Sequence, residues 1–243
     1  MSLCRYHTDG SPDSAFGKNG LVTFEDTRQN HITSAAGRIT FDDNGNILVA
    51  GQLDFTTALW RFKNNGALDN SFGNNGYVTI REKYMDRETY GNKQDIVIDQ
   101  QGRILIKGFY SIPVDDMISV RNMIAARFTR DGSLDTTFGK NGVVNSDFAN
   151  EVLNGNGSVV RSDGSILMAF NGFRLYRYTE DGSRDTAAAD SGYAVFRPND
   201  RELGYGTVTD MITRNKEIII MGNATGHGNV QRMVLWRLPE TNN

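Results

Sequence analysis

An arginine and an aspartate recur at a fixed separation along the chain, and such a pair could serve either catalysis or structure. The aspartate lies eight residues after the arginine in four places, and a glycine lies fifteen residues after it. An active site is normally built once in a domain, whereas this pair is repeated. We therefore expect each arginine to bind its aspartate across a hairpin loop through bidentate guanidinium–carboxylate bonding. The pairs are Arg5 and Asp13, Arg61 and Asp69, Arg127 and Asp135, and Arg177 and Asp185.

Two groups of neighbouring carboxylates could act as a general acid and base. Asp115 and Asp116 are adjacent, and Asp86 lies two residues before Glu88. Glycoside hydrolysis requires two carboxyl groups about 5 to 9.5 Å apart, and sequence spacing does not fix that distance. A glycan hydrolase or lyase that uses these carboxylates is therefore kept as an alternative function.

The sequence contains no motif for a metal or a cofactor. Cys4 is the only cysteine, which excludes an internal disulfide and a Cys/His metal framework. Residues 42–46 (DDNGN) have a faint likeness to a calcium loop, but they lack the length and the closing glutamate of an EF-hand, so we expect a β-turn there. We find no phosphate-binding loop, nucleophile elbow or HExxH motif. The sequence thus predicts no cofactor, no metal, no catalytic residue and no enzymatic activity.

The Arg–Asp pairs belong to a repeat that fills the chain. Arg237 begins a fifth copy, and successive arginines are 56, 66, 50 and 60 residues apart. Repeats of this length made of short strands are typical of a propeller. Each repeat contains four strand candidates: A and B flank a short turn, C carries the arginine, and D follows the glycine. The A-B hairpins begin at residues 38, 94, 158 and 209, the C strands occupy 58–62, 123–128, 173–178 and 233–238, and the D strands occupy 21–24, 77–80, 143–145 and 193–196.

The order of the strand candidates predicts how the propeller closes. The chain reads C-D, then A-B-C-D three times, then A-B-C, which gives an all-β propeller of about four blades of four antiparallel strands in one domain, 1–243. A blade shared between the termini would protect sheet edges that otherwise invite pairing with other chains. The C-like strands at 3–6 and 234–238 compete for one position in that blade. Either one of them is an extra edge strand in a monomer, or two chains form a dimer by exchanging ends.

The repeats resemble the bacterial delta-60 β-propeller repeat. RFTRDGSLDTTFGKNG from Arg127 nearly matches that family's recurring motif ARYNxDGSLDTTFGxxG, and NGNILVAG from Asn44 resembles its second motif, DGKIxVAG. The resemblance covers essentially the whole chain. It implies a propeller scaffold and no common activity, because fold and function are separate arguments. The fourth copy departs from the pattern, since Ala188 and Ala189 replace Phe-Gly, which predicts a looser C-D loop there.

Loop lengths indicate which face of the propeller carries the function. The A-B turns and C-D loops share one face and keep nearly constant lengths, whereas the D-A and B-C connections on the other face vary. Variable loops on a rigid scaffold are where binding residues tend to lie. We therefore predict a non-catalytic recognition or scaffold module that binds a protein partner, as an adaptor, an inhibitor or an immunity-type protein; a carbohydrate-binding propeller is an alternative. The variable connections are 25–35, 81–93, 147–156 and 197–206 (D-A) and 110–122 and 224–232 (B-C), and the predicted partner-binding residues are Tyr84, Asp86, Arg87, Tyr90, Asp115, Asp116, Arg201, Glu202 and Tyr205.

Charge and hydropathy bear on the location of the protein and on its possible partners. A net charge of −3 provides no basic stripe for nucleic acid. The N-terminus lacks the basic and apolar regions of a signal peptide, and no stretch has the roughly 18 apolar residues of a membrane span. The sequence as given therefore predicts a cytoplasmic protein without a membrane partner. An extracellular or surface location is the alternative if the chain is a fragment.

Overall fold

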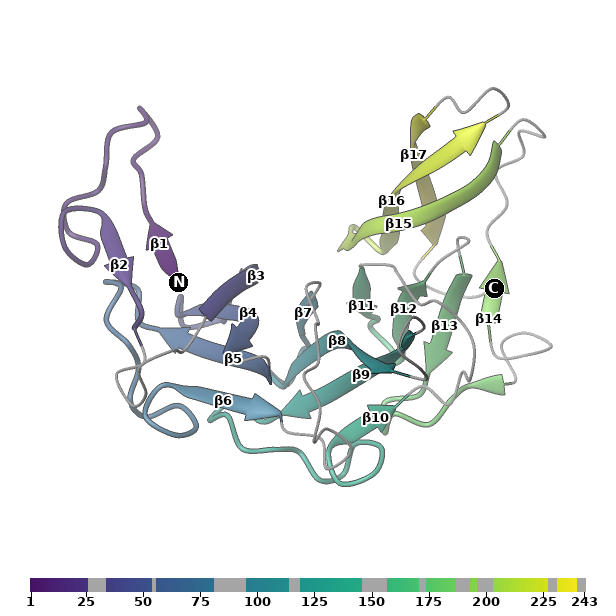
Figure 1. The fold of residues 1–243 in the computed structure, drawn as a ribbon, viewed down its shortest axis with the longest axis horizontal. Helices are drawn as coiled ribbons and strands as arrows, with labels where there is room; N and C mark the ends of the chain where they lie inside the picture. Colours follow the sequence, from purple (N-terminus) through teal and green to yellow (C-terminus); the bar gives the residue numbers. More distant parts are fainter. Residues whose placement is uncertain are drawn as a thin grey trace. The chain divides into compact units, whose positions relative to one another are not determined.

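The computed structural model describes residues 1–25, 34–53, 56–80, 95–113, 119–145, 157–170, 174–186, 193–195, 203–226 and 231–239. All named elements within these stretches are β-strands (Figure 1), as the repeat pattern predicts. The strands are β1 (Ser2–Cys4), β2 (Leu21–Thr23), β3 (Ser34–Phe41), β4 (Ile47–Leu53), β5 (Thr56–Phe62), β6 (Tyr77–Ile80), β7 (Asp95–Ile98), β8 (Ile104–Pro113), β9 (Ser119–Phe128), β10 (Val143–Asn145), β11 (Ser158–Val160), β12 (Ile166–Phe170), β13 (Arg174–Tyr178), β14 (Tyr193–Val195), β15 (Leu203–Arg214), β16 (Glu217–Gly226) and β17 (Gln231–Pro239).

The strands form separate sheets in which neighbours in sequence are neighbours in space. The orders are β1-β2, β3-β4-β5-β6, β7-β8-β9-β10, β11-β12-β13-β14 and β15-β16-β17. The strand pairs for which the residue register is defined are antiparallel. This is the predicted A-B-C-D order, with C-D first and A-B-C last. None of the described sheets is closed, so the blade count and the closure of the ring stay predictions.

We call the face that carries the D-A and B-C connections the variable face. The strands that end there are longer than the sequence predicts. Residues 110–122 were expected to form a B-C loop, but β8 runs to Pro113 and β9 begins at Ser119. Likewise β16 runs to Gly226 and β17 begins at Gln231, within the connection expected at 224–232. Tyr205, expected in a D-A loop, lies in β15. Val, Ile, Thr, Tyr and Phe in these segments fit a pleated, partly buried surface, so pairing continues beyond the region of repeated sequence.

One A-B turn forms without glycine. Arg214 pairs with Glu217, so Asn215 and Lys216 make a two-residue hairpin turn. Both central residues have positive φ, 52° and 62°, as a type I′ turn requires. Asparagine tolerates the left-handed region, which helps this turn to form without glycine.

The chain divides into two compact units, one made of Met1–Ile112 with Ala126–Asp135 and the other of Pro113–Ala125 with Thr136–Asn243. The first contains a core between hairpin β1-β2 and the sheet β3–β6, where Leu3, Val22 and Phe24 pack against Trp60 and its neighbours. In the second, side chains of β11, β12 and β13 pack against β15 and β16. Each core thus lies between consecutive sheets, which is how a repeat buries faces that it cannot bury alone. The expectation of one domain stays a prediction.

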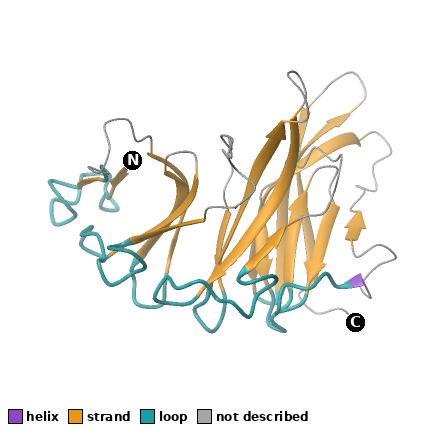
Figure 2. Ribbon diagram, turned by 60° about the horizontal axis from the view of Figure 1, so that its bottom comes forward, coloured by secondary structure: helices purple, strands orange, loops and turns teal. Residues whose placement is uncertain are grey.

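The A-B turn and the C-D loop of a repeat lie at the same end of its strands (Figure 2). In the first unit, Arg130 of a C-D loop donates from Nε to the carbonyl O of Gln101 in the A-B turn of the same repeat, at 2.7 Å. Its Nη2 lies 3.2 Å from Oδ2 of Asp43, in the preceding A-B turn. These contacts agree with the expectation that A-B turns and C-D loops share one face.

Candidate functional site

In the four full copies of the repeat, the arginine binds the aspartate eight residues later. The Nε–Oδ2 distances are 2.8 Å for Arg5 and Asp13, 2.7 Å for Arg61 and Asp69, 2.7 Å for Arg127 and Asp135, and 3.1 Å for Arg177 and Asp185. The prediction that these residues meet across the C-D hairpin is confirmed. We call each such pair a clamp.

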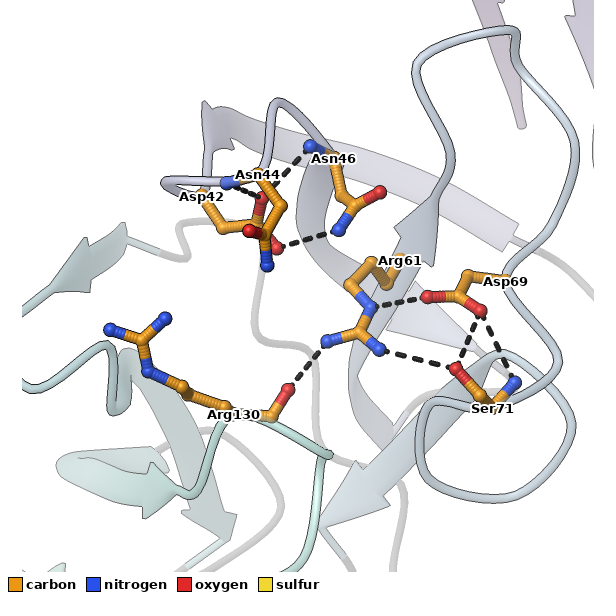
Figure 3. Close-up of polar contacts among 7 residues, drawn as sticks. All are labelled: Asp42, Asn44, Asn46, Arg61, Asp69, Ser71 and Arg130. Atoms are coloured by element: carbon orange, nitrogen blue, oxygen red, sulfur yellow. Dashed lines mark hydrogen bonds and ion pairs between the residues drawn. The ribbon is translucent and has the colours of Figure 1, made fainter.

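The second donor group of the arginine binds the following repeat (Figure 3). Arg61 donates from Nη1 to the carbonyl O of Arg130 at 2.5 Å. Arg5 donates from Nη1 to the carbonyl O of Asn64, and also to Oδ1 of Asn64 at 2.9 Å. In these two clamps, Nε binds the aspartate while Nη1 holds the backbone of the next loop, an arrangement that differs from the predicted bidentate Arg–Asp bond.

In three of the clamped loops, a phenylalanine packs against a glycine of the following repeat. Phe72 is fully buried, and the Arg61 guanidinium carbon lies 4.6 Å from the centre of its ring. Gly132 lies so close that a Cβ on it would stand 3.0 Å from the ring and 2.8 Å from the backbone N of Gly73. Phe16 and Gly66, and Phe138 and Gly182, repeat the arrangement. These phenylalanines therefore pack between neighbouring repeats.

We call the face that carries the A-B turns and the C-D loops the clamped face. Other carboxylates on this face accept hydrogen bonds within the turns in which they lie. Asp131 accepts hydrogen bonds from Thr129 Oγ1 and from the backbone N of Ser133. These bonds hold the pKa of the Asp131 carboxyl below its usual value, with the Thr129 hydroxyl the largest cause. The carboxyl of Asp181 has a lowered pKa for the same reason, with Thr179 and Ser183 as donors. Ionised carboxylates with these partners act as turn caps and are not poised as general acids.

The DDNGN stretch folds as a turn of the same kind. Oδ1 of Asp42 accepts from the backbone N of Asn44 at 2.9 Å and of Asn46 at 2.8 Å, and Oδ2 accepts from Asn46 Nδ2 at 2.9 Å (Figure 3). The carboxylate thus points back at its own backbone. The predicted β-turn is confirmed. Within the described stretches, no group of three His, Cys, Asp or Glu residues could hold a metal ion.

A buried charge cluster in the first unit was not predicted from the sequence. Lys107 on β8 is 1% exposed and lies opposite Asp95 of β7 in the strand register. Arg38 on β3 places its Nε 3.4 Å from Oδ1 of Asp95, and Oδ2 of Asp95 is buried and accepts no hydrogen bond from the described residues. Burial lowers the pKa of the Lys107 amine to about 8; Asp95 opposes that shift, and Arg38 adds to it.

This cluster departs from the repeat, which is the signal that could have revealed it. The residues at the position of Lys107 in other B strands are Ala50, which pairs with Arg38, and Met221, which pairs with Asp210. An amine with a pKa near 8 is partly unprotonated at neutral pH and could in principle serve as a base. Because Lys107 is enclosed, no reactant reaches it in this conformation. Because the Lys107 amine is buried, we expect its charge to affect the stability of the fold.

Most of the residues predicted to bind a partner lie outside the described residues. Tyr205 lies in β15, outside any described loop, and its side chain is not described. The others lie outside the described residues, as do the remaining carboxylate of the hydrolase alternative, Glu88, and Ala188 and Ala189 of the fourth C-D loop. They are Tyr84, Asp86, Arg87, Tyr90, Asp115, Asp116, Arg201 and Glu202.

No helix among the described residues is long and apolar enough to cross a membrane. The predicted cytoplasmic location and the predicted absence of nucleic-acid and membrane partners stay predictions.

One comparison with known proteins, a family model, supports a propeller fold. Residues 43–72 and 118–138 match the model of a family described as a domain of unknown function (DUF5122) β-propeller. No curated protein matches the chain. Among solved structures, the chain is similar to a crystal structure of glucose dehydrogenase, with 12% identity and a TM-score of 0.42 over 83% of this chain and 62% of that one. The chain therefore spans less than two thirds of that structure's length. The antiparallel sheets make this an all-β protein, and the family match supports a propeller fold for the matched residues.

Proposed function

We propose that this chain is a β-propeller of about four blades, one of them assembled from strands at both ends, and that it is a non-catalytic recognition or scaffold module for a protein partner. Its sequence pattern resembles the delta-60 repeat. The partner contacts the face formed by the D-A and B-C connections.

The observation that carries this proposal is the use made of the polar side chains on the opposite face. There the repeated arginines bind an aspartate and, in the first unit, the backbone of the following loop. Asp131 and Asp181 are held by turn donors. Groups committed to position loops are poor candidates for catalysis, since a catalytic acid or base must exchange its proton with a substrate. Recognition is therefore assigned to the face whose connections differ between repeats.

The test compares two sets of substitutions on opposite faces. One variant carries Arg87→Ala, Tyr90→Ala, Arg201→Ala and Tyr205→Ala on the variable face. The matched control carries Lys18→Ala, Lys63→Ala and Lys140→Ala, which are exposed on the clamped face. The partner is first identified by cross-linking and mass spectrometry in lysate from the protein's own source. The affinity of the purified partner for each variant is then measured by interferometry.

We expect the variable-face variant to lose at least about tenfold in affinity, or roughly 1.4 kcal/mol, while the control binds as wild type does. Circular dichroism and melting temperature establish that both variants are folded. Equal affinity of all three proteins, or a loss confined to the control, would contradict the proposal. Wild-type binding on a glycan array that is lost in the variable-face variant would instead support the carbohydrate-binding alternative.

A further inference from the structure

The C-terminal sheet exposes an apolar face. We call Ile212, Ile219, Met221, Met233 and Leu235 the outer face of this sheet. Met221 pairs with Leu235 across β16 and β17, and Ile212 pairs with Ile219 across β15 and β16, so these side chains are contiguous on one side. Leu235 is 62% exposed and Met233 70% exposed. A contiguous exposed group of large apolar side chains is typical of an interaction site.

The same face is buried in the repeats before it. Leu235 lies two residues before Arg237, as Leu59 and Leu175 lie before Arg61 and Arg177, and both of these leucines are buried. In the second unit, Leu175 and Ala169 pack against Ile218 and Ile220 of the next sheet. The outer face of one sheet therefore normally meets the inner face of the following sheet.

The first four-stranded sheet exposes the counterpart of this interface. Ile39 and Phe41 on β3 are 54% and 63% exposed. Ile39 pairs with Val49, the position that Met211 holds opposite Ile220, and Met211 is buried by the preceding repeat. Hairpin β1-β2 packs against the core around Trp60 through Leu3, Val22 and Phe24, and it leaves β3 open to solvent.

We propose that the outer face of the C-terminal sheet docks on the β3 surface of a second copy, head to tail. One end of the chain carries the outer half of an interface that the chain already forms between its own repeats, and the other end carries the inner half. Each copy therefore presents two different and complementary apolar surfaces. Such an interface is heterologous, so it generates a closed ring of copies or a longer chain of them.

Docking in this geometry requires an exchange of strands. Arg237 corresponds to Arg5, so β17 of the incoming sheet takes the position that β1 holds beside β2. β1 has three residues and β17 has nine, all paired with β16. The shorter strand is the one that gives way, because fewer backbone hydrogen bonds must be replaced. The inference rests on the proposal that the two ends share a blade, and it assigns those ends to different copies.

The test uses two single substitutions and their mixture. Leu235→Lys places a charge on the outer face, and Phe41→Lys places one on the β3 surface. Thr213→Lys, on an exposed residue whose side chain alternates away from the outer face, is the matched control. Molar masses are measured by light scattering after size exclusion, over a series of concentrations, and folding is checked by circular dichroism.

We expect wild type and the Thr213 variant to form dimers or larger assemblies as concentration rises, and each of the other two variants to stay monomeric. An equimolar mixture of the Leu235 and Phe41 variants should form a one-to-one dimer, because each supplies the surface that the other has lost. Assembly of the Phe41 variant alone would overturn the proposal in favour of an outer face that binds itself.

A wild type that is monomeric at every concentration would also overturn the proposal. Melting temperatures then test whether the two ends form the shared blade within one chain. If both lysine variants melt below the Thr213 control, the ends close within one chain. If they melt with the control, the shared blade fails as well. Neither result bears on the variable-face affinity test, so the proposed recognition function stands or falls separately.

Discussion

Arg61 donates a hydrogen bond from Nη1 to the carbonyl O of Arg130, 69 residues later in the chain, at a distance of 2.5 Å. The same guanidinium holds Asp69 in its own repeat through Nε. A single side chain therefore fixes a loop and attaches the next repeat to it. This dual role explains why arginine recurs at this position, since lysine presents a point charge without two separate donor edges.

The clamp is expected to be structural. Arg127→Ala should lower the free energy of unfolding by about 3 to 5 kcal/mol, because it leaves the carboxylate of the buried Asp135 without its cation. The exposed Lys63→Ala serves as control and should change stability by no more than about 0.5 kcal/mol. Urea denaturation and melting temperature measure both changes, and partner affinity per folded molecule should stay constant. Equal melting temperatures for Arg127→Ala and wild type would contradict this role.

Two glycines with the same backbone conformation should respond differently to alanine. Gly10 and Gly132 have φ of 86° and 87°, but a Cβ on Gly10 meets open space whereas one on Gly132 meets Phe72 and the backbone of Gly73. Both alanine variants bear the left-handed cost of about 1 to 2 kcal/mol. Gly132→Ala should lose about 1 to 3 kcal/mol more through overpacking. Similar losses in chemical denaturation would show that the loop adjusts to the added methyl group.

Lys107 should make stability depend on alkaline pH. Its pKa is lowered in the folded state from 10.5 to about 8, so the unfolded chain binds more protons between these values. Linkage then makes the free energy of unfolding rise as pH increases from about 8 to 10.5, and the shift corresponds to about 3 kcal/mol. This contribution is complete above the unfolded value and is lost as pH falls through the folded one.

The measurement is urea denaturation across that pH range for wild type and Lys107→Met, with Met chosen because Met221 holds the equivalent place. The variant should lack the rise that wild type shows. Parallel pH profiles for the two proteins would mean that Lys107 is protonated normally in the folded state.

A glycine in place of Lys216 should stabilise the turn at Asn215 and Lys216. Lys216 has φ of 62°, a conformation that costs a residue with a Cβ more than it costs glycine. Lys216→Gly creates the Asn-Gly pair favoured in type I′ turns and should raise the free energy of unfolding by about 0.5 to 1 kcal/mol. Asn215→Gly is the comparison and should gain less, because asparagine already tolerates this region. A lower melting temperature for Lys216→Gly would refute the assignment.

The sequence was informative where the repeat keeps its register. Arg61, Asp69 and Phe72 stand at constant spacing in successive copies, so their contacts within a loop could be inferred from hairpin geometry. The attachment of Arg61 to Arg130 could not, because spacing says nothing about which carbonyl of another repeat comes within reach.

Contacts that depend on non-repeated residues were also missed. Lys107 meets Asp95 and approaches Arg38 only because three strands from two repeats align, and each strand alone looks ordinary. The extension of β8 and β9 past the repeated region was mispredicted for a related reason. Residues 110–122 were predicted as a loop because they lie between the repeated B and C segments, whereas strands that are already aligned can continue to pair beyond those segments.

The contacts from Arg5 to Asn64 and from Arg61 to Arg130 use the same atoms in both places. An interface that repeats in this way requires no new surface when a repeat is gained or lost. Recombination between copies within the gene could therefore change the number of blades in one step and still yield a protein whose neighbours fit. Selection could then vary the connecting segments in each copy separately while the contacts between the repeats stay the same.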